Sequence, residues 1–226
     1  MPVTDPKNSS GSYASSPCYA AEFEQPLDAQ QQRDVNNWRS AERKRQRERR
    51  RALTPEQQDS YAQAVAAHLD SLLEKKYGDI AGKVVGGYWP IQGELDLVFW
   101  FHKLCKRGVR VALPITIEQD APLIFREWLP ETNMEKDRWH IPIPPVENAQ
   151  LLPEILLSPL LAWDVAGYRL GYGGGYFDRT LAALSPKPFV IGVGIQVAQV
   201  PTIFPQTYDI PMDAVVTEIG VHSPSQ

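Results

Sequence analysis

The chain has 226 residues, of which 43% are hydrophobic, and it carries a formal net charge of −4. This length and apolar content predict one domain with a sizeable core, and no apolar run is long enough to span a membrane. The two cysteines, Cys18 and Cys105, exclude a disulfide framework and favour a reducing compartment. We therefore expect a cytoplasmic protein without membrane contact.

Residues 1–37 are rich in Ser, Pro, Gln and Ala and contain few aliphatic side chains. This composition predicts a disordered N-terminal extension, and residues 38–226 are expected to form a single domain. The extension lacks the apolar core of a secretory peptide. Its acids outnumber its bases, which does not suit a mitochondrial presequence.

Positive charge is concentrated in residues 39–51, where eight bases and two acids give a net charge of +6 within a chain of −4. A basic element on an acidic body indicates a small polyanionic ligand or a nucleic acid. The composition from Trp38 to Arg51 favours a helix, on which Arg39 and Arg43 share one face. We expect five further bases of this run to face mainly solvent, namely Lys44, Arg45, Arg47, Arg49 and Arg50.

A second helix is predicted from Thr54, with Pro55 in the first turn and Gln57 completing a capping box, to Gly78. Helices are also predicted over 94–107 and 176–184, and strands over 83–88, 109–113, 123–128, 155–163, 189–195 and 214–218. This alternation predicts a single α/β domain with a mainly parallel, doubly wound (Rossmann-like) sheet and helices on both faces. Ligands then bind at the carboxyl ends of the strands, around residues 89–94, 114 and 164–175.

A glycine-rich loop at residues 171–175 has four glycines in five positions, with Arg169 before it and Arg179 after it. Glycine lets successive backbone N–H groups approach one anion, and the predicted helix that follows adds a partly positive N-terminus. The spacing matches neither G-x-G-x-x-G nor a loop closed by G-K-[ST]. We interpret the segment as a phosphate-binding loop; the alternative is a tight, well-packed turn.

Trp163-Asp164 and residues 167–179, which read GYRLGYGGGYFDR, closely resemble the signature of the 5-formyltetrahydrofolate cyclo-ligase (5,10-methenyltetrahydrofolate synthetase) family. That signature runs roughly FD-x-x-G-x-RLG-x-G-x-GYYDR. Further similar blocks follow in the family's order at residues 49–54, 92–94, 111–114 and 208–218. The resemblance implies conversion of 5-formyltetrahydrofolate to 5,10-methenyltetrahydrofolate, with ATP as co-substrate, Mg²⁺ as metal, and release of ADP and phosphate after phosphorylation of the formyl oxygen.

The same resemblance implies the roles of individual residues. ATP would be bound by Arg39, Arg43, Arg169, Leu170, Gly171, Tyr172, Gly173, Gly174, Gly175, Tyr176 and Phe177. The folate would be bound by Trp89, Glu94, Tyr172, Gly173, Gly174, Gly175 and Tyr176. Catalysis would rest on Arg169, Gly173, Gly174, Gly175 and Tyr176, and Mg²⁺ on Asp178 and Asp209. The chain departs from the family at Gly174, where some members have lysine.

Several of these residues also have purely structural explanations. Asp178 is favourable in the first turn of a helix, Asp209 suits an ordinary loop, and Glu94 suits a helix cap. Asp164 could line the site or anchor the glycine loop through hydrogen bonds. Four aromatic residues could form the wall of a folate pocket or belong to the core, namely Tyr88, Phe125, Trp128 and Trp139.

Two other functions remain open at this point. The helix of residues 39–51 could bind nucleic acid, or the sheet could belong to a sugar-phosphate or acyl-CoA enzyme. Under the folate reading we expect a monomer whose only partner is the small-molecule substrate, without nucleic acid.

Overall fold

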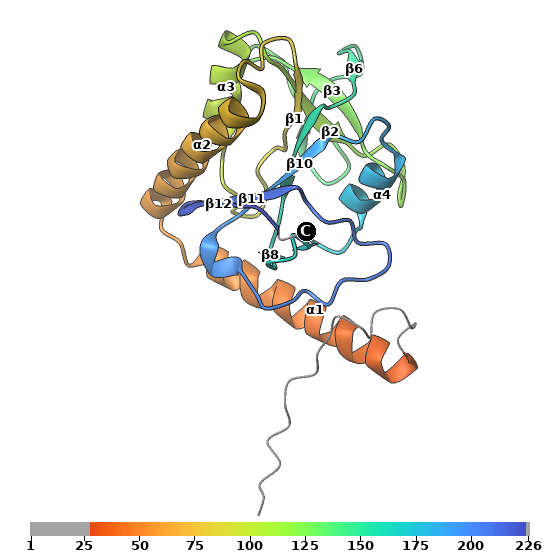
Figure 1. The fold of residues 1–226 in the computed structure, drawn as a ribbon. Coiled ribbons are helices and arrows are strands. Elements are labelled where there is room, and N and C mark those ends of the chain that lie inside the picture. Colours follow the sequence, from red (N-terminus) through yellow and green to blue (C-terminus); the bar gives the residue numbers. More distant parts are fainter. Residues whose placement is uncertain (1–27, 225–226) are drawn as a thin grey trace, which may run out of the picture.

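The computed structural model of the protein describes residues 28–224 (Figure 1). The expected disorder of residues 1–27 lies outside this range. Residues 29–37, predicted to belong to the disordered extension, are helical, because α1 (Ala29–Arg51) begins at a capping box. The Asp28 carboxylate accepts the backbone N–H groups of Gln30 and Gln31, and the Gln31 side chain accepts the Asp28 N–H. The predicted boundary at residue 37 is therefore wrong.

The remaining elements follow in chain order. The helices are α2 (Pro55–Tyr77), α3 (Val98–Lys106), α4 (Tyr176–Ala183) and the 3₁₀ turn η2 (Gln196–Ala198). The strands are β1 (Val84–Gly86), β2 (Arg110–Ile115), β3 (Ile124–Trp128), β4 (Glu135–Lys136), β5 (Pro142–Ile143), β6 (Gln150–Leu151), β7 (Ile155–Pro159), β8 (Ala162–Trp163), β9 (Arg169–Leu170), β10 (Phe189–Val193), β11 (Ala214–Thr217) and β12 (Gly220–His222).

Eight of these strands form one sheet in the order β12-β11-β10-β7-β1-β2-β3-β6. The five strands from β11 to β2 are mutually parallel, and β12, β3 and β6 pair antiparallel at the two edges. The sheet lies between α2 and α3 on one side and α4 on the other (Figure 1). The predicted α/β fold with a mainly parallel sheet and helices on both faces is confirmed.

The order of the strands reverses between β1 and β7. From β1 the chain passes through α3 to β2 on one side, whereas from β7 it passes through α4 to β10 on the other. Right-handed crossovers in opposite directions place α3 and α4 on opposite faces and leave a crevice at the carboxyl ends of β1 and β7. The topology therefore predicts a ligand site at these two strand ends.

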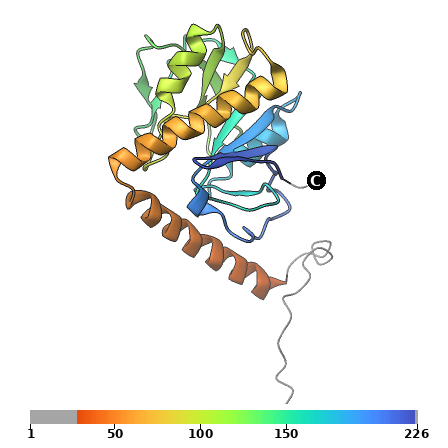
Figure 2. The same ribbon diagram turned by 60° about the vertical axis from the view of Figure 1, so that its left-hand side comes forward.

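The helices are held to the sheet by apolar stripes. Val65, Leu69 and Leu73 of α2 are fully buried, and α2 crosses one face of the sheet to pack on β11 and β12 (Figure 2). Trp100 of α3 is also fully buried, and its indole N–H donates to Asp70 of α2 at 3.0 Å. Burial of side chains of this size stabilises the fold by about 2–3 kcal/mol each. None of the described helices is long and apolar enough to cross a membrane.

Besides α1, two predicted elements differ from the observed ones in more than their end residues. The helix predicted from residue 94 begins at Val98, because residues 91–94 form a turn in which Gln92 and Gly93 have positive φ angles of 49° and 78°. The strand predicted over 155–163 divides into β7 and β8, and β8 turns away to pair with β9. Residues 155–158 and 160–163 are all buried, so the sequence has no alternation of apolar and polar residues that would mark the end of the first strand.

Candidate active site

A pocket of about 950 Å³ opens at the carboxyl ends of the central strands. We call it the main pocket. Tyr88 follows β1, Pro114 lies near the end of β2, and Pro159 ends β7, so the pocket occupies the crevice that the topology predicts. Its size suits ligands as large as a nucleotide or a folate. Its other wall is formed by the glycine loop and the inner face of α1.

The glycine loop has a backbone that only glycine adopts easily. Gly173 has a φ of +105°, and Gly175, the N-cap of α4, has a φ of +64°. A Cβ on Gly174 would lie 2.9 Å from the ring of Tyr176. In the described part of the chain no side chain caps α4, so its first N–H groups are available to an anion in the pocket.

Arg39 and Arg43 reach the loop from α1. The Arg43 Nε donates to the Gly171 carbonyl oxygen at 2.9 Å, and the Arg43 guanidinium lies beside Gly173. Burial lowers the pKa of Arg43, and the neighbouring charges of Arg39 and Arg47 lower it further. Crowded positive charges of this kind are relieved by an anionic ligand.

Arg169 is buried and faces the start of α4. It donates to Asp178 Oδ1 at 2.8 Å and to the Ile210 carbonyl oxygen at 2.9 Å. Asp178 Oδ1 also accepts the Ile210 N–H at 3.0 Å. Burial lowers the pKa of Arg169, and the charge of Asp178 opposes this effect. Asp178 Oδ2 receives no hydrogen bond from any described residue, so one oxygen of this carboxylate remains available in the pocket wall.

Asp209 is more fully engaged. Its Oδ2 accepts from Arg39 at 2.6 Å and from the Gln206 N–H at 2.8 Å, and its Oδ1 accepts from Arg39 at 3.3 Å. Within residues 28–224, no three His, Cys, Asp or Glu side chains form a group that could hold a metal. A metal in this pocket would therefore depend on ligand oxygens as well as on Asp178 and Asp209.

The opposite wall of the main pocket contains a buried carboxylate. Only 7% of Glu94 is exposed, and burial raises its pKa to about 7 despite the Ile91 N–H, the charge of Arg50 and the hydroxyl of Tyr172. The Glu94 Oε2 accepts the Ile91 N–H at 3.0 Å. This bond closes the 91–94 turn, so Glu94 does not cap α3. Burial likewise raises the pKa of Tyr172 to about 12, and the charge of Glu94 adds to the effect.

Aromatic side chains line this wall in part. Trp89 and Trp139 both border the main pocket, and Trp139 contacts Tyr176 edge to face with ring centroids 6.2 Å apart. Tyr88 borders the pocket while its hydroxyl donates to the Leu95 carbonyl oxygen. Phe125 and Trp128 belong to the core on β3 and do not line the pocket.

All but one of the predicted site residues line the main pocket. The exception is Leu170, whose side chain is fully buried in a small apolar cluster with Val200 and Ile203. The residues that border the pocket are Arg39, Arg43, Trp89, Glu94, Arg169, Gly171, Tyr172, Gly173, Gly174, Gly175, Tyr176, Phe177, Asp178 and Asp209. Their geometry is compatible with the predicted roles.

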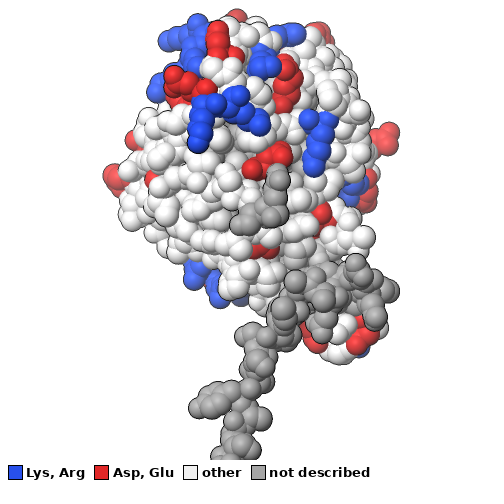
Figure 3. Space-filling view, in the orientation of Figure 1, with Lys and Arg blue, Asp and Glu red and all other residues white. Residues whose placement is uncertain are grey.

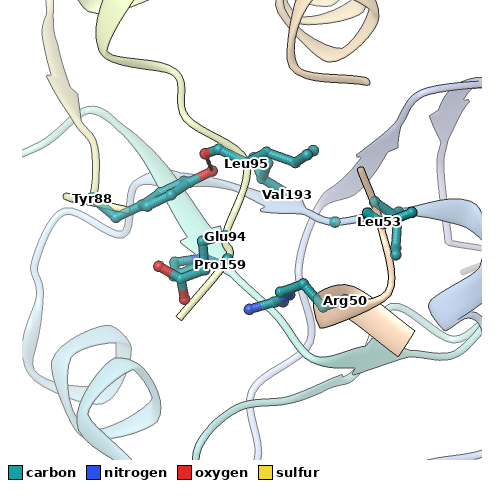
Figure 4. A pocket seen from close by; sticks show the side chains of 10 residues that line it. Arg50, Leu53, Tyr88, Glu94, Leu95, Pro159 and Val193 are labelled. Atoms are coloured by element: carbon teal, nitrogen blue, oxygen red, sulfur yellow. Dashed lines mark hydrogen bonds between the residues drawn. The ribbon is translucent and has the colours of Figure 1, made fainter. Parts of the chain in front are cut away.

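Arg50 was expected to face solvent, and this expectation is wrong. The last turn of α1 passes over the glycine loop and the end of β7, so the side chain points inward and is 8% exposed. Arg50 Nη1 donates to the Tyr172 hydroxyl at 2.9 Å, and Nη2 donates to the Leu160 carbonyl oxygen at 2.6 Å. Figure 4 shows Arg50 extending from α1 toward Glu94. Nothing in the charge run distinguishes this arginine from its exposed neighbours.

Asp164 has an anchoring role. It is buried, and its two carboxylate oxygens accept the N–H groups of Tyr168 at 3.1 Å and Ile203 at 3.0 Å. It does not border the main pocket. Arg179 packs outside the loop, where it donates to the Gly174 carbonyl oxygen and lies over the Tyr176 ring.

The charges of α1 do not form one basic surface. Among the bases of residues 39–51, Arg39 and Arg50 are buried and Arg43 and Arg47 half-buried against the domain, whereas four are exposed: Lys44, Arg45, Arg49 and Arg51. On the face shown in Figure 3, the basic side chains over α1 form one small group near the end that joins α2. This arrangement favours a ligand inside the pocket over a nucleic acid along the helix.

Comparison with known proteins agrees with this geometry. The model of the 5-formyltetrahydrofolate cyclo-ligase family matches residues 35–218. The 5-formyltetrahydrofolate cyclo-ligase of Escherichia coli K12 is 33% identical over 177 residues, which cover 76% of this chain and 95% of that protein. The protein of the same description from Haemophilus influenzae is 31% identical over 166 residues, 71% of this chain and 87% of that one.

Solved structures agree as well. The NMR structure of 5,10-methenyltetrahydrofolate synthetase from Aquifex aeolicus aligns with a TM-score of 0.70 and 30% identity, covering 83% of this chain and 93% of that one. The 5,10-methenyltetrahydrofolate synthetase of Mycoplasma pneumoniae, at 23% identity and a TM-score of 0.65, shares the fold over 80% of this chain and 98% of its own. The sequence, the fold and the pocket therefore lead to one conclusion: the chain belongs to the 5-formyltetrahydrofolate cyclo-ligase family.

Proposed function

We propose that this protein converts 5-formyltetrahydrofolate and ATP to 5,10-methenyltetrahydrofolate, ADP and phosphate. The observation that carries the proposal is the division of the main pocket into two unlike halves. One half has three arginines and an uncapped helix N-terminus beside the glycine loop. The other has aromatic walls around a buried carboxylate. A nucleotide triphosphate and a folate need these two environments, respectively, next to each other.

The anion half suits the phosphates of ATP. Arg39, Arg43 and Arg169 converge on the glycine loop, whose N–H groups at Gly173–Gly175 can bind phosphate oxygens without any side chain. We assign catalysis to Arg169, Gly173, Gly174, Gly175 and Tyr176. Their role is to hold the γ-phosphoryl group and stabilise its charge during transfer, which requires no protein nucleophile.

The donor set fits one Mg²⁺ that also binds phosphate. Asp178 keeps Oδ2 free of hydrogen bonds within the described chain, and a hard cation needs only one or two carboxylates when phosphates and water complete its shell. Asp209 would contribute next to Asp178 while it orients Arg39. When bound, Mg²⁺ would neutralise charge on the phosphate oxygens.

The folate half suits the pterin. The Glu94 carboxylate can accept N–H donors of the pterin ring, and Trp89 and Tyr172 can pack against its flat faces. Because Glu94 is closed off from bulk water, hydrogen bonds from a substrate would replace the hydration that burial removes. This half would fix the formyl group beside the glycine loop.

The reaction then proceeds in two steps. The formyl oxygen on N5 attacks the γ-phosphorus of ATP, the bond to ADP breaks, and an N5-iminium phosphate forms. N10 attacks the activated carbon and loses its proton, and the C–O bond breaks to release phosphate. The product contains the new C–N10 bond, and the formyl oxygen leaves in phosphate. Positioning of the three reacting groups supplies most of the catalysis.

The test is incubation with MgATP and 5-formyltetrahydrofolate labelled with ¹⁸O in the formyl group. We expect the near-ultraviolet absorbance of the methenyl product, one ADP per product, and the label in phosphate. A non-hydrolysable ATP analogue serves as the control and should give no product. Absence of product would contradict the activity, and unlabelled phosphate would contradict phosphorylation of the formyl oxygen.

A further inference from the structure

The charge run on α1 contributes a residue that lies behind Glu94 and Tyr172 of the main pocket. Arg50 is eleven residues beyond Arg39, so it lies about three helical turns further along α1. Its guanidinium makes two hydrogen bonds, to the Tyr172 hydroxyl and to the Leu160 carbonyl oxygen. One side chain thus ties α1 both to the glycine loop and to the segment after β7.

Arg50 also faces Glu94. A second, much smaller cavity of about 10 Å³ is lined by both side chains, together with Tyr88, Leu95 and Pro159 (Figure 4). This is the volume of about one water molecule, and Arg50 points across it toward Glu94. Arg50 also packs on the turn that carries Glu94, since a Cβ on Gly93 would lie 3.3 Å from Arg50 Cγ.

We propose that Arg50 is a positioning residue of the folate half: it fixes the Tyr172 hydroxyl and supplies the counter-charge of the Glu94 carboxylate. The proposal rests on the proposed function, because it assumes that Glu94 and Tyr172 contact the folate. Arg50 itself does not border the main pocket and would touch neither substrate.

The charges around Glu94 support this role. Arg50 is the one basic side chain among the groups that act on the Glu94 pKa, and it lowers that pKa; the Tyr172 hydroxyl from the glycine loop also lowers it. Tyr88, which follows β1, is neutral because burial raises its own pKa well above the usual range. Burial opposes the charged form of Glu94. Without Arg50, a larger fraction of Glu94 would be protonated at neutral pH.

A protonated Glu94 would carry an O–H donor and would lose part of its capacity as an acceptor. Recognition of pterin N–H donors would weaken as the pH falls, and the midpoint of that change would report the Glu94 pKa. An opposite charge within about 4–6 Å shifts a carboxyl pKa by about one unit or more. Loss of Arg50 should therefore raise the midpoint by about one pH unit.

The experiment compares Arg50→Met and Arg50→Lys with the wild type and with Arg51→Met, a matched control on an exposed base of the same turn. The first readout is ¹³C NMR titration of the Glu94 carboxyl in the full-length protein without ligand. We expect Arg50→Met to raise the Glu94 midpoint by about one unit, and Arg50→Lys to preserve it because the charge remains. Arg51→Met should leave it unchanged.

The second readout separates positioning from charge. Lysine cannot bond Tyr172 and Leu160 together, so Arg50→Lys should raise the KM for 5-formyltetrahydrofolate about tenfold while the KM for ATP stays constant. This variant also keeps the test decisive if Arg50→Met does not fold. In Arg50→Lys/Glu94→Gln, the pH dependence of folate binding should disappear.

Unchanged Glu94 titration in Arg50→Met, or an unchanged folate KM in Arg50→Lys, would overturn the proposal. Failure of the proposed function has a different signature, namely a wild-type protein that neither binds 5-formyltetrahydrofolate nor forms the methenyl product. The NMR titration does not depend on either activity.

Discussion

The two halves of the main pocket hold their charges in opposite ways. In the phosphate half, Arg39 is paired with Asp209 and Arg169 with Asp178, each through hydrogen bonds of 2.6–2.8 Å. In the folate half, Glu94 is buried and its pKa is raised to about 7. The first half therefore holds its charges as ion pairs, whereas in the second half burial disfavours the charged form of the carboxylate.

This difference suits the ligands that we propose for each half. Phosphate is charged at neutral pH, so arginines that are always charged and held in fixed positions match it well. A folate ring presents neutral donors and acceptors, and a carboxylate in a dry site discriminates among them because an unmet hydrogen bond is expensive there. The comparison can be tested by changing one residue in either half and measuring the kinetic or binding constants for both substrates.

The largest effect is expected for Gly173→Val. A β-branched side chain resists a φ of +105°, and its Cβ would lie 3.5 Å from the Arg43 guanidinium carbon. We expect kcat/KM for ATP to fall about 10³-fold, measured by release of ADP, with little change in the Kd for 5-formyltetrahydrofolate.

Gly171→Ala is the control for that variant. Its Cβ would meet no atom within 4 Å, and the carbonyl oxygen that Arg43 bonds is retained. Activity close to that of the wild type is expected. Normal ATP turnover in Gly173→Val would show that the glycines only form a turn.

Asp178→Asn is expected to have the next largest effect. The Asn side-chain oxygen can keep the bonds to Arg169 and the Ile210 N–H, so the fold is preserved while one negative charge is lost. Turnover should fall about 10²-fold, and the Mg²⁺ concentration for half-maximal rate should rise. An unchanged Mg²⁺ requirement would remove Asp178 from the proposed metal site.

Much of the phosphate half could be predicted from the sequence. The glycine pattern and the four-residue spacing of Arg39 and Arg43 are local features. Such features depend on neighbouring residues in the sequence and not on tertiary contacts. The α/β architecture was predictable for the same reason, since the period of the apolar residues changes between helix and strand. The early start of α1 also has a local signal in the sequence, the Asp28–Gln31 capping box.

The folate half was less predictable because its properties arise from tertiary contacts. The burial of Arg50 depends on where the end of α1 crosses the 160–172 segment, and no single-helix pattern contains that information. Glu94 was expected to open a helix, but its carboxylate closes the preceding turn instead. Desolvation of a carboxylate depends on the whole surrounding structure, so a pKa near 7 could not be read from the chain.

Glu94→Gln tests the folate half directly. In the wild type the Glu94 pKa rises from 4.5 to about 7 on folding, so its contribution to stability is present below pH 4.5 and is lost as the pH rises through 7. Glutamine should therefore stabilise the unliganded protein by up to about 3 kcal/mol at pH 8 and by little at pH 5. Thermal unfolding at the two pH values measures this difference.

The same variant should bind 5-formyltetrahydrofolate more than tenfold less tightly at pH 8, with ATP binding unchanged, because one charged acceptor is lost. A loss of stability at pH 8, with both substrates affected equally, would instead assign Glu94 a structural role in the 91–94 turn.

Trp139→Leu tests where the boundary between the two halves lies, and it should have the smallest effect on the kinetic constants. Trp139 is 47% exposed at the rim of the main pocket, and its ring contacts Tyr176 of the glycine loop edge to face. Leucine keeps an apolar surface but loses the aromatic contact, which is worth about 1 kcal/mol. If Trp139 belongs to the folate half, the KM for 5-formyltetrahydrofolate should rise about fivefold while the KM for ATP stays constant. A change in the KM for ATP alone would instead place Trp139 in the phosphate half, where it would act through its contact with Tyr176. The boundary between the two halves would then lie between Trp139 and the folate site.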